Sequence, residues 1–448
     1  MPKSKIRYVG LDVHKDSISI AFADKGNSDA CFIGKIPSDW ASLHKKLLKI
    51  GDGFSLRICY EAGPTGYQLY RRLQQEAYDC IVIAPSKMPR KPGDRVKTDR
   101  RDAIQLALNH RSGYHTPVTV PDPETEALRD LERCRENAKK QEIAVKNQLN
   151  KFLLRYNIIY NNGSSWTQKH FIWLRQLKFE LESQQIAFLD CLEAVESANA
   201  RVDRLTAEIE RMLPKSSLAP LATALKALRG IQTVSAAVIV AEIGDLRRFP
   251  TADQLMAYVG LCPSQNSSGA RVRTGSITKT GNQRVRRILV EAAWHYRTNS
   301  IVSKVHRTRL DTVSPGVRKI ALSALRRLHL KYNHLTRDRN KNSCVATVAI
   351  ARELVGFIWA IGHEQHLLAN QATQPPEEKD NEPQRALKKP VRVSKSDART
   401  TLPVKSPSIK KGIKPPLEDS QAEMKSRIRK EQSGRDDRQK SKRLQTQT

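Results

Sequence analysis

The chain has 448 residues, which corresponds to about three domains at roughly 150 residues each. Lysine and arginine number 78 against 46 aspartate and glutamate, giving a formal net charge of +32. An excess of this size predicts a polyanionic partner such as nucleic acid, because neutralising phosphates releases condensed counterions. The seven cysteines are widely spaced and contain no Cys-x-x-Cys pair, which argues against a disulfide framework and against structural zinc.

Basic surfaces also occur on ribosome-associated and membrane-surface proteins, so charge alone does not define the partner. No apolar run reaches the 18 or so residues that span a bilayer, and the first ten residues lack the apolar segment of a signal peptide. The sequence therefore predicts a cytoplasmic protein with no membrane partner.

Residues 1–120 alternate between strand-like and helix-like patterns. Strands are predicted at 7–13, 17–23, 31–36, 55–60 and 80–84, and helices at 38–50, 66–76 and 98–109, with Ser38 as a candidate N-cap. Three early strands followed by alternating helix and strand indicate a mixed α/β sheet domain.

Residues 121–214 are predicted to be a long helical, coiled-coil segment. Apolar residues recur there every seven positions, which requires a second helix to cover the stripe. The two series are Leu181, Phe188, Val195, Val202 and Ile209, and Cys191, Ala198, Leu205 and Met212. The covering helix is either residues 124–156 of the same chain, across a turn at Asn161-Asn162-Gly163, or a second protomer.

The remaining sequence divides into a mainly α-helical basic domain, residues 225–367, and a tail, residues 371–448. The tail contains 20 Lys and Arg, 11 Asp and Glu, and no Phe, Trp or Tyr. It cannot bury enough apolar surface to offset its ordering entropy, so the sequence predicts a disordered basic tail.

Four carboxylates in the first domain are candidate metal ligands. Asp12 lies within the first predicted strand, where acidic residues are rare, and Glu61 follows the fourth. Asp99 and Asp102 are three residues apart, so they project from one face of a helix. Such oxygen ligands suit Mg²⁺, which assists phosphoryl transfer. The alternative is that Glu61 is a turn residue and the two helical aspartates form a solvated face paired with nearby arginines.

Two features of the helical domain are candidate phosphate-handling sites. Residues 230–234, GIQTV, are typical of the turn in a helix-hairpin-helix, whose amides can contact backbone phosphate, although such a turn is also common in ordinary packing. Residues 263–269 are predicted to form a polar loop containing Ser267 and Ser268. A serine hydroxyl surrounded by cations is suited to attack a phosphodiester, whereas Ser-Ser-Gly is also a common flexible turn. The cations that follow are Arg271, Arg273, Lys279, Arg284, Arg286 and Arg287.

The motifs LDVHK, YEAGPTGY and VKTDRRDA, in this order, resemble those of the DEDD transposases of the insertion-sequence 110/1111 group, relatives of the Piv-type DNA invertases. The block GLCPSQNSSGARVRTGSITKTGNQRVRRILVEAAW is similar to their C-terminal transposase domain. The resemblance implies a RuvC-like (ribonuclease H fold) first domain whose Asp12, Glu61, Asp99 and Asp102 bind Mg²⁺. It also implies a serine nucleophile, Ser268 or else Ser267. Members often have a second glycine where this chain has Ala270.

The resemblance further implies a recombinase that cuts and rejoins DNA to move an insertion sequence. A bridge RNA would pair with donor and target DNA, and a homodimer or homotetramer would join the carboxylates of one protomer to the serine of another. The chain has no G-x-x-x-x-G-K-[ST] phosphate loop, in keeping with chemistry that needs no nucleotide. Two alternatives remain: a RuvC-like nuclease that hydrolyses branched DNA with water as the nucleophile, and a noncatalytic nucleic-acid-binding protein.

Overall fold

A computed structural model describes residues 5–85, 98–268 and 271–373. The chain divides into two units, Met1–Glu377 and Glu378–Thr448, and every described residue belongs to the first. The predicted disordered tail therefore lies almost wholly outside the described residues. Its first three residues are an exception, because helix α13 continues through Thr373 and residues 371–373 are helical.

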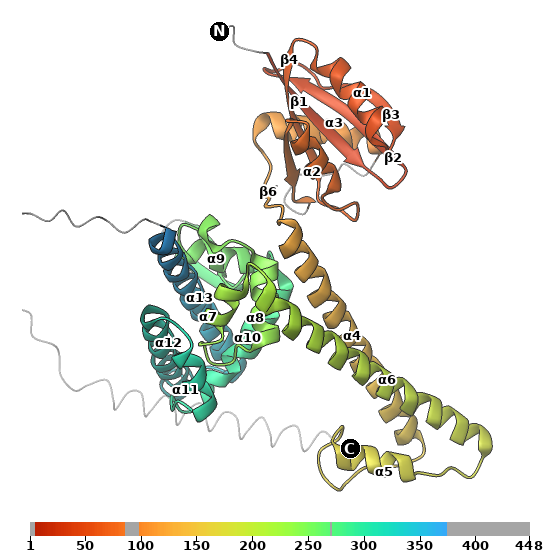
Figure 1. The fold of residues 1–448 in the computed structure, drawn as a ribbon, viewed down its shortest axis with the longest axis vertical. Coiled ribbons are helices and arrows are strands. Elements are labelled where there is room, and N and C mark those ends of the chain that lie inside the picture. Colours follow the sequence, from red (N-terminus) through yellow and green to blue (C-terminus); the bar gives the residue numbers. More distant parts are fainter. Residues whose placement is uncertain (1–4, 86–97, 269–270, 374–448) are drawn as a thin grey trace, which may run out of the picture. The chain divides into compact units, whose positions relative to one another are not determined.

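The N-terminal region contains a six-stranded mixed sheet in the order β3-β2-β1-β4-β5-β6 (Figure 1). Strands β1 to β3 are antiparallel neighbours, β4 and β5 run parallel to β1, and β6 is antiparallel to β5. The strands are β1 Lys5–Val13, β2 Ser17–Asp24, β3 Cys31–Pro37, β4 Phe54–Glu61, β5 Asp79–Ile83 and β6 Pro117–Val118. The five predicted strands and the mixed α/β class are confirmed, whereas the two-residue β6 was not predicted.

Three helices pack on this sheet: α1 Trp40–Gly51, α2 Gln68–Gln75 and α3 Asp99–Ser112. The alternation of side chains along β1 separates two cores. Leu11 faces a cluster that includes Leu43 of α1 and Leu73 of α2, while Leu106 of α3 packs with residues on the other face. The N-cap prediction was wrong by one residue. Asp39, not Ser38, accepts the hydrogen bond from the Ser42 amide.

The coiled-coil segment forms an antiparallel helical pair, α4 Pro123–Arg155 and α6 Glu182–Met212 (Figure 1). The predicted stripe is covered within the chain, because Phe188 and Val195 pack with Phe152 of α4. The ends of the two series do not belong to the stripe: Leu181 and Met212 are exposed. The predicted direct turn was also wrong, since the connection contains a further helix, α5 Gln168–Gln176, whose Leu174 joins the same cluster.

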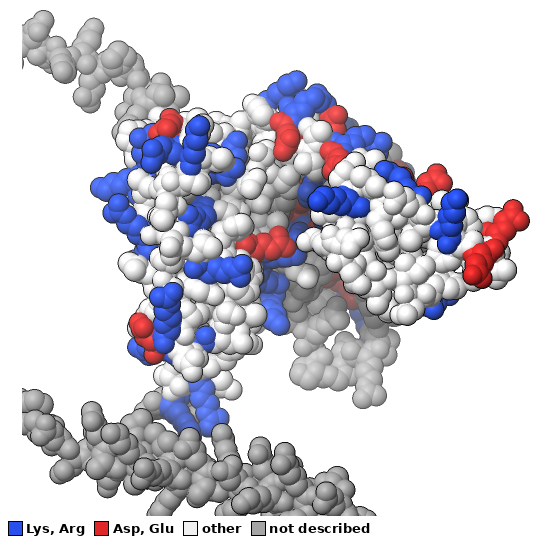
Figure 2. All heavy atoms as spheres, turned by 90° about the horizontal axis from the view of Figure 1, so that it is seen from below, with Lys and Arg blue, Asp and Glu red and all other residues white. Residues whose placement is uncertain are grey.

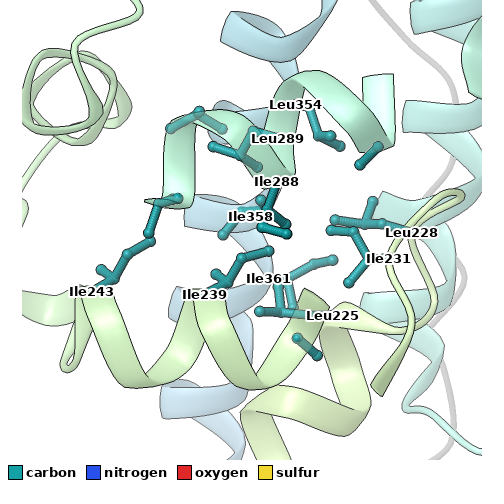
Figure 3. Close-up of a cluster of buried hydrophobic side chains, with 14 of the residues drawn as sticks. Leu225, Leu228, Ile231, Ile239, Ile243, Ile288, Leu289, Leu354, Ile358 and Ile361 are labelled. Atoms are coloured by element: carbon teal, nitrogen blue, oxygen red, sulfur yellow. The ribbon is translucent and has the colours of Figure 1, made fainter. Parts of the chain in front are cut away.

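The C-terminal region is mainly helical, as predicted, and also contains one β-hairpin. Its elements are η2 Leu213–Lys215, α7 Ala219–Leu225, α8 Thr233–Ile243, η3 Leu246–Arg248, α9 Ala252–Val259, β7 Pro263–Ser268, β8 Arg271–Ile277, α10 Gln283–Ala293, η4 Trp294–Arg297, α11 Lys304–Asp311, α12 Pro315–Asn333, η5 His334–Asp338 and α13 Ser343–Thr373. Side chains from α8, α10 and α13 point toward one another in its core (Figure 3). The labelled core residues are Leu225, Leu228, Ile231, Ile239, Ile243, Ile288, Leu289, Leu354, Ile358 and Ile361.

Helix α13 is apolar because it forms the centre of this core. Within the described residues, its segment Ser343–Leu368 is the one helix long and apolar enough to cross a membrane by length and composition, although Arg352 and Glu353 interrupt its apolar run. Its buried residues Ile350, Leu354 and Ile358 belong to the main hydrophobic cluster. Their burial explains the composition of α13 by packing within the protein.

Candidate active site and metal-binding cluster

The position of Asp12 follows from the alternation of side chains along β1. Val9 and Leu11 point to the α1 side of the sheet, so Gly10 and Asp12 point to the α3 side. A Cβ atom on Gly10 would lie 2.5 Å from both the Ala103 carbonyl oxygen and the Ala107 amide nitrogen of α3. Glycine is therefore required for the close approach of α3 to β1, just before Asp12.

Helix α3 begins beside this strand and carries the second pair of carboxylates. Thr98 caps the helix by accepting a hydrogen bond from the Arg101 amide, and Asp99 and Asp102 lie in the first turn. Lys35 of β3 donates a hydrogen bond of 2.8 Å to Asp99. The capped helix thus brings two carboxylates that are distant in sequence to the strand that carries Asp12.

His14 joins these groups into one cluster. Its Nε2 atom lies 3.2 Å from an Asp12 oxygen and 3.7 Å from an Asp99 oxygen. One ligand atom from each of these three residues falls within 4.8 Å of the others, which is close enough for all three to hold a metal ion. Asp12 is half-buried, whereas the His14 side chain is exposed.

The electrostatics of the cluster favour an added cation. Burial raises the pKa of Asp12, the adjacent His14 lowers it, and the nearby Asp102 and Asp99 carboxylates raise it further. The hydrogen bond from Lys35 lowers the pKa of Asp99 and raises that of Lys35. Carboxylates gathered around a half-buried aspartate repel one another, and a hard divalent cation that prefers oxygen ligands would relieve this repulsion.

Glu61 reaches the same side of the sheet from the neighbouring strand. The parallel pairing of β1 and β4 ends at Leu11 opposite Tyr60, so Asp12 and Glu61 follow at the carboxyl ends of two adjacent strands. Glu61 points to the α3 side, as does Cys59 two residues earlier. Asp12 and Glu61 both line a cavity of about 990 Å³.

Two residues of this cluster, His14 and Lys35, were not identified from the sequence as site residues. The signal for His14 was present, since it lies two residues after Asp12 at the end of a strand and so faces the same side. Lys35 carried no such signal, because its contact with Asp99 depends on how strand β3 lies relative to helix α3.

The candidate serines lie in a β-hairpin, so the prediction of a loop over 263–269 was wrong. Ser267 pairs with Val272 and Ser268 with Arg271 across the antiparallel strands β7 and β8. Every residue of β7 is exposed. Gln265 donates a hydrogen bond of 2.8 Å to the Ser267 hydroxyl. Among the described residues, the Ser268 hydroxyl has no hydrogen-bond partner, and Gly269 and Ala270 lie outside them.

The arginines after the hairpin do not surround the serines as a group. Arg284 pairs with Glu136 of α4, Arg286 donates to the Val259 carbonyl, and Arg287 pairs with Glu291. The cations of the hairpin itself, Arg271 and Arg273, are exposed and lie in β8. Three of the six expected cations are therefore held by partners away from the serines, while Arg271 and Arg273 lie in the hairpin and Lys279 is exposed just after it.

The predicted helix-hairpin-helix turn is packed against the helical core. Gly230 has φ +83°, and a Cβ atom there would lie 2.5 Å from the Ala292 carbonyl oxygen. Arg229 donates to the Asn299 carbonyl at 2.7 Å. Glycine is therefore explained by close packing at this turn, which was the alternative reading of the motif.

The chain matches two family models. The model described as "Transposase IS116/IS110/IS902 family" matches residues 222–307, and a model of the DEDD transposases of the IS110 group, described as "Transposase", matches residues 9–158. The second match includes all four candidate carboxylates, and the first includes the hairpin with both serines.

The chain is also similar to several transposases along most of its length. It is 42% identical over 359 residues to the putative transposase y4qE of Sinorhizobium fredii, which covers 80% of this chain and 88% of the relative. It is 31% identical over 338 residues to the transposase of insertion sequence element IS1533 of Leptospira borgpetersenii, covering 75% and 98%. The transposase of element IS1328 of Yersinia enterocolitica is 25% identical over 370 residues, covering 80% and 96%.

An acidic cluster on a mixed sheet and these matches define the class of the protein, which is a DNA-cutting enzyme of insertion-sequence transposition. More narrowly, the chain belongs to the DEDD transposases of the IS110 group.

Proposed function

We propose that this transposase cuts and rejoins DNA by serine attack on a phosphodiester, with Mg²⁺ held by Asp12, Glu61, Asp99 and Asp102. A bridge RNA selects the donor and target DNA. The observation that carries the proposal is the convergence of Asp12, His14 and Asp99, with Asp102 close enough to raise the pKa of Asp12. This arrangement is expected where two phosphate oxygens and a cation must be held together.

We assign the sheet domain to the RuvC-like (ribonuclease H) fold. Its three antiparallel strands followed by two parallel ones, with an aspartate on the central strand β1, support the assignment. The proposed functional division is a RuvC-like DEDD domain at 1–120, a helical coiled-coil segment at 121–214, a transposase domain at 225–367 and a basic tail at 371–448.

The donor set of the cluster suits Mg²⁺. Four carboxylates offer hard oxygen ligands, and Mg²⁺ is usually bound by one or two carboxylates together with waters and substrate phosphates. When bound, Mg²⁺ supplies Lewis-acid stabilisation of the charge on the transferring phosphoryl group. His14 orients the Asp12 carboxylate through its 3.2 Å contact, and Lys35 holds Asp99.

Ser268 is the proposed nucleophile, with Ser267 as the second candidate. Its oxygen attacks phosphorus, a phosphorus–oxygen ester bond of the DNA strand breaks, and the leaving 3′ oxygen takes up a proton as the serine gives one up. The product is a 5′-phosphoserine ester, and attack by a new 3′ hydroxyl reverses the step. Hydrogen bonding supports this choice. Among the described residues, the Ser268 hydroxyl has no hydrogen-bond partner, whereas the Ser267 hydroxyl accepts a hydrogen bond from Gln265. Arg271 and Arg273 would stabilise the phosphoryl charge.

The proposed assembly is a homodimer or homotetramer in the cytoplasm, in which the carboxylates of one protomer serve the serine of another. Among the described residues, no hydrogen bond or ion pair joins β7 or β8 to the sheet domain. The lack of such contacts between the hairpin and the sheet domain is consistent with a site that two protomers share and that assembles on DNA and RNA.

The test is a denaturing gel of end-labelled element-junction DNA mixed with the full-length protein, the flanking noncoding RNA and Mg²⁺. We expect a DNA species shifted by covalent protein, which is lost in Ser268→Ala and retained in Ser267→Ala. Ser276→Ala is the matched control, because Ser276 is an exposed serine of the same hairpin. Loss in Ser267→Ala alone would exchange the two roles.

One result would overturn the serine chemistry. If both Ser268→Ala and Ser267→Ala cleave DNA at the wild-type rate without a covalent species, water is the nucleophile. The protein would then act as a RuvC-like nuclease in which the hairpin only binds.

A further inference from the structure

Helices α11 and α12, together with the short helix η5, carry a large excess of basic over acidic residues. Residues 303–342 contain eleven Lys and Arg and two Asp and Glu. Helices α4 and α6, by comparison, together carry eleven basic and thirteen acidic residues. Figure 2 shows Lys and Arg spread over the left-hand part of the molecule, the side on which Figure 1 draws the C-terminal helices, with fewer Asp and Glu among them. The excess of basic residues is therefore larger in this segment than in α4 and α6.

A groove of about 760 Å³ lies along the exposed side of α12. Its wall carries two pairs of cations, Arg318 with Lys319 and Arg326 with Arg327. Arg318 is paired with Asp311 at 2.6 Å and Arg327 with Glu353 at 3.3 Å. Lys319 and Arg326 are exposed and form no ion pair with any described residue. One cation of each pair is thus available to an external anion.

A second, smaller cavity of about 200 Å³ borders the groove at the turn between α11 and α12. Thr312 lines this cavity and the next residue, Val313, lines the groove. The cavity wall also carries Lys226 and Arg309, together with further threonine hydroxyls. Neither cation forms an ion pair within the part of the chain that the structure describes. The Lys226 ammonium and the Arg309 guanidinium, beside threonine hydroxyls, can together bind one phosphate group.

The geometry points to a docking surface for the sugar-phosphate backbone of duplex DNA, formed by the groove on α12 and the adjoining cavity. We name it the α12 surface, and define its contacts as Lys226, Arg309, Lys319 and Arg326. The family-model match over residues 222–307 ends before Arg309, so three of the four contacts of this surface lie beyond the matched segments. The inference rests on the DNA substrate of the family and not on the serine chemistry or the guide RNA.

The contacts favour duplex DNA over other occupants. Lys319 and Arg326 are seven residues apart, and Arg318 and Arg327 are nine residues apart. The two cation pairs therefore lie about 12 Å apart along the helix axis, a distance comparable with the width of the major groove of B-DNA. Among the described residues, no aromatic side chain lines the groove, whereas single strands are bound largely by stacking on aromatic rings. The chain's own tail from 371 carries a net positive charge, so it would be repelled.

The experiment measures how the affinity of the full-length protein for a 30-base-pair duplex of arbitrary sequence changes with salt. The test variant is Lys319→Gln/Arg326→Gln, and Lys226→Gln/Arg309→Gln is the second. The matched control is Lys45→Gln/Lys49→Gln, which removes two exposed cations from α1. Each phosphate contact that is lost should make the slope of log K against log salt shallower by about 0.9, so about 1.8 for each test variant.

We expect both test variants to bind duplex DNA about tenfold more weakly or worse near physiological salt, equally for unrelated sequences, while the control matches wild type. Slopes equal to that of the control would overturn the proposal. A loss confined to single-stranded DNA or duplex RNA, tested in parallel, would overturn duplex DNA as the occupant. Thermal unfolding of each variant identifies a folding defect, and the exposed positions Lys319 and Arg326 should show none. The covalent-adduct test is separate, so either proposal can fail alone.

Discussion

The acidic cluster and the serine hairpin differ in how the fold holds their candidate functional groups. Asp12, Asp99 and Glu61 extend from elements whose other faces are buried in the sheet domain. Ser267 and Ser268 lie in a two-stranded ribbon whose first strand is exposed throughout. A packed core fixes side chains before substrate arrives, whereas an isolated hairpin is only marginally stable by itself. The comparison teaches that the fold holds the carboxylates in place, whereas the described hairpin has no buried strand face of its own.

The largest effect is expected at the preorganised cluster, from Asp12→Asn. Asparagine keeps the shape of the side chain but removes the charge that a cation requires, so Mg²⁺-dependent strand exchange should fall by at least about 10³-fold. DNA affinity, measured by a gel-shift assay without Mg²⁺, should be retained. Affinity for the phosphate backbone depends on basic side chains, and this change removes none of them.

The control for this change is Asp29→Asn, which alters an exposed aspartate between β2 and β3. It should exchange strands at the wild-type rate. Undiminished exchange in Asp12→Asn would contradict the metal-binding role of the cluster, and a loss of DNA affinity would show that the aspartate acts in binding.

Gly10→Val should produce the next largest effect, on the stability of the sheet domain. The new side chain meets backbone atoms of α3 at 2.5 Å, and neither Ala103 nor Ala107 can move without shifting the helix. Overpacking of this kind costs about 1–3 kcal/mol, and backbone contact places this site at the upper end. Urea unfolding followed by circular dichroism measures the change.

Gly10→Ala and Gly63→Ala serve as graded comparisons. A Cβ atom on Gly63 would have its nearest neighbour at 3.9 Å, so that variant should unfold with wild-type stability. Wild-type stability in Gly10→Val would show that α3 does not pack closely on β1, and the account of how Asp99 and Asp102 reach Asp12 would fail with it.

A third test addresses the base of the hairpin, which is tied to the helical core through buried carboxyl groups. Asn282, five residues after β8, donates a hydrogen bond of 2.7 Å to Glu242, which also accepts from Arg133 at 2.7 Å. Burial raises the pKa of Glu132, and the adjacent Glu242 carboxylate raises it further. Burial alone would raise the pKa of Glu242, but the hydrogen bonds from its neighbours lower it.

This pair predicts a loss of stability at alkaline pH. Because the pKa of Glu132 is raised in the folded state, its stabilising contribution is complete below the ordinary carboxyl pKa and is lost as pH rises through the raised value. Between neutral pH and pH 9.5 the unfolding free energy should fall by on the order of 1 kcal/mol more in wild type than in Glu132→Gln. Glu193→Gln, an exposed change on α6, should retain the wild-type slope, and equal slopes in all three proteins would contradict the prediction.

The same contrast explains which parts of the molecule could be predicted from sequence. The strands around Leu11 and Ile58 carry short runs of buried apolar residues, because helices cover both faces of the sheet, so their positions could be predicted. The β7 sequence PSQNSS has no such alternation, since both its faces are exposed and only pairing with β8 defines it. Lys35 was missed for a related reason: its partner Asp99 is 64 residues away, and only the tertiary fold brings them together.

The smallest effect is expected from Val272→Thr in the hairpin. Val272 is 63% exposed and pairs across the ribbon with Ser267, so its replacement by another β-branched residue removes little buried apolar surface. The unfolding free energy of the free protein should change by less than about 0.5 kcal/mol. A loss above about 1 kcal/mol in urea unfolding would show that the hairpin packs against the core without substrate. The serines would then be as preorganised as the carboxylates, and no partner would be needed to position them.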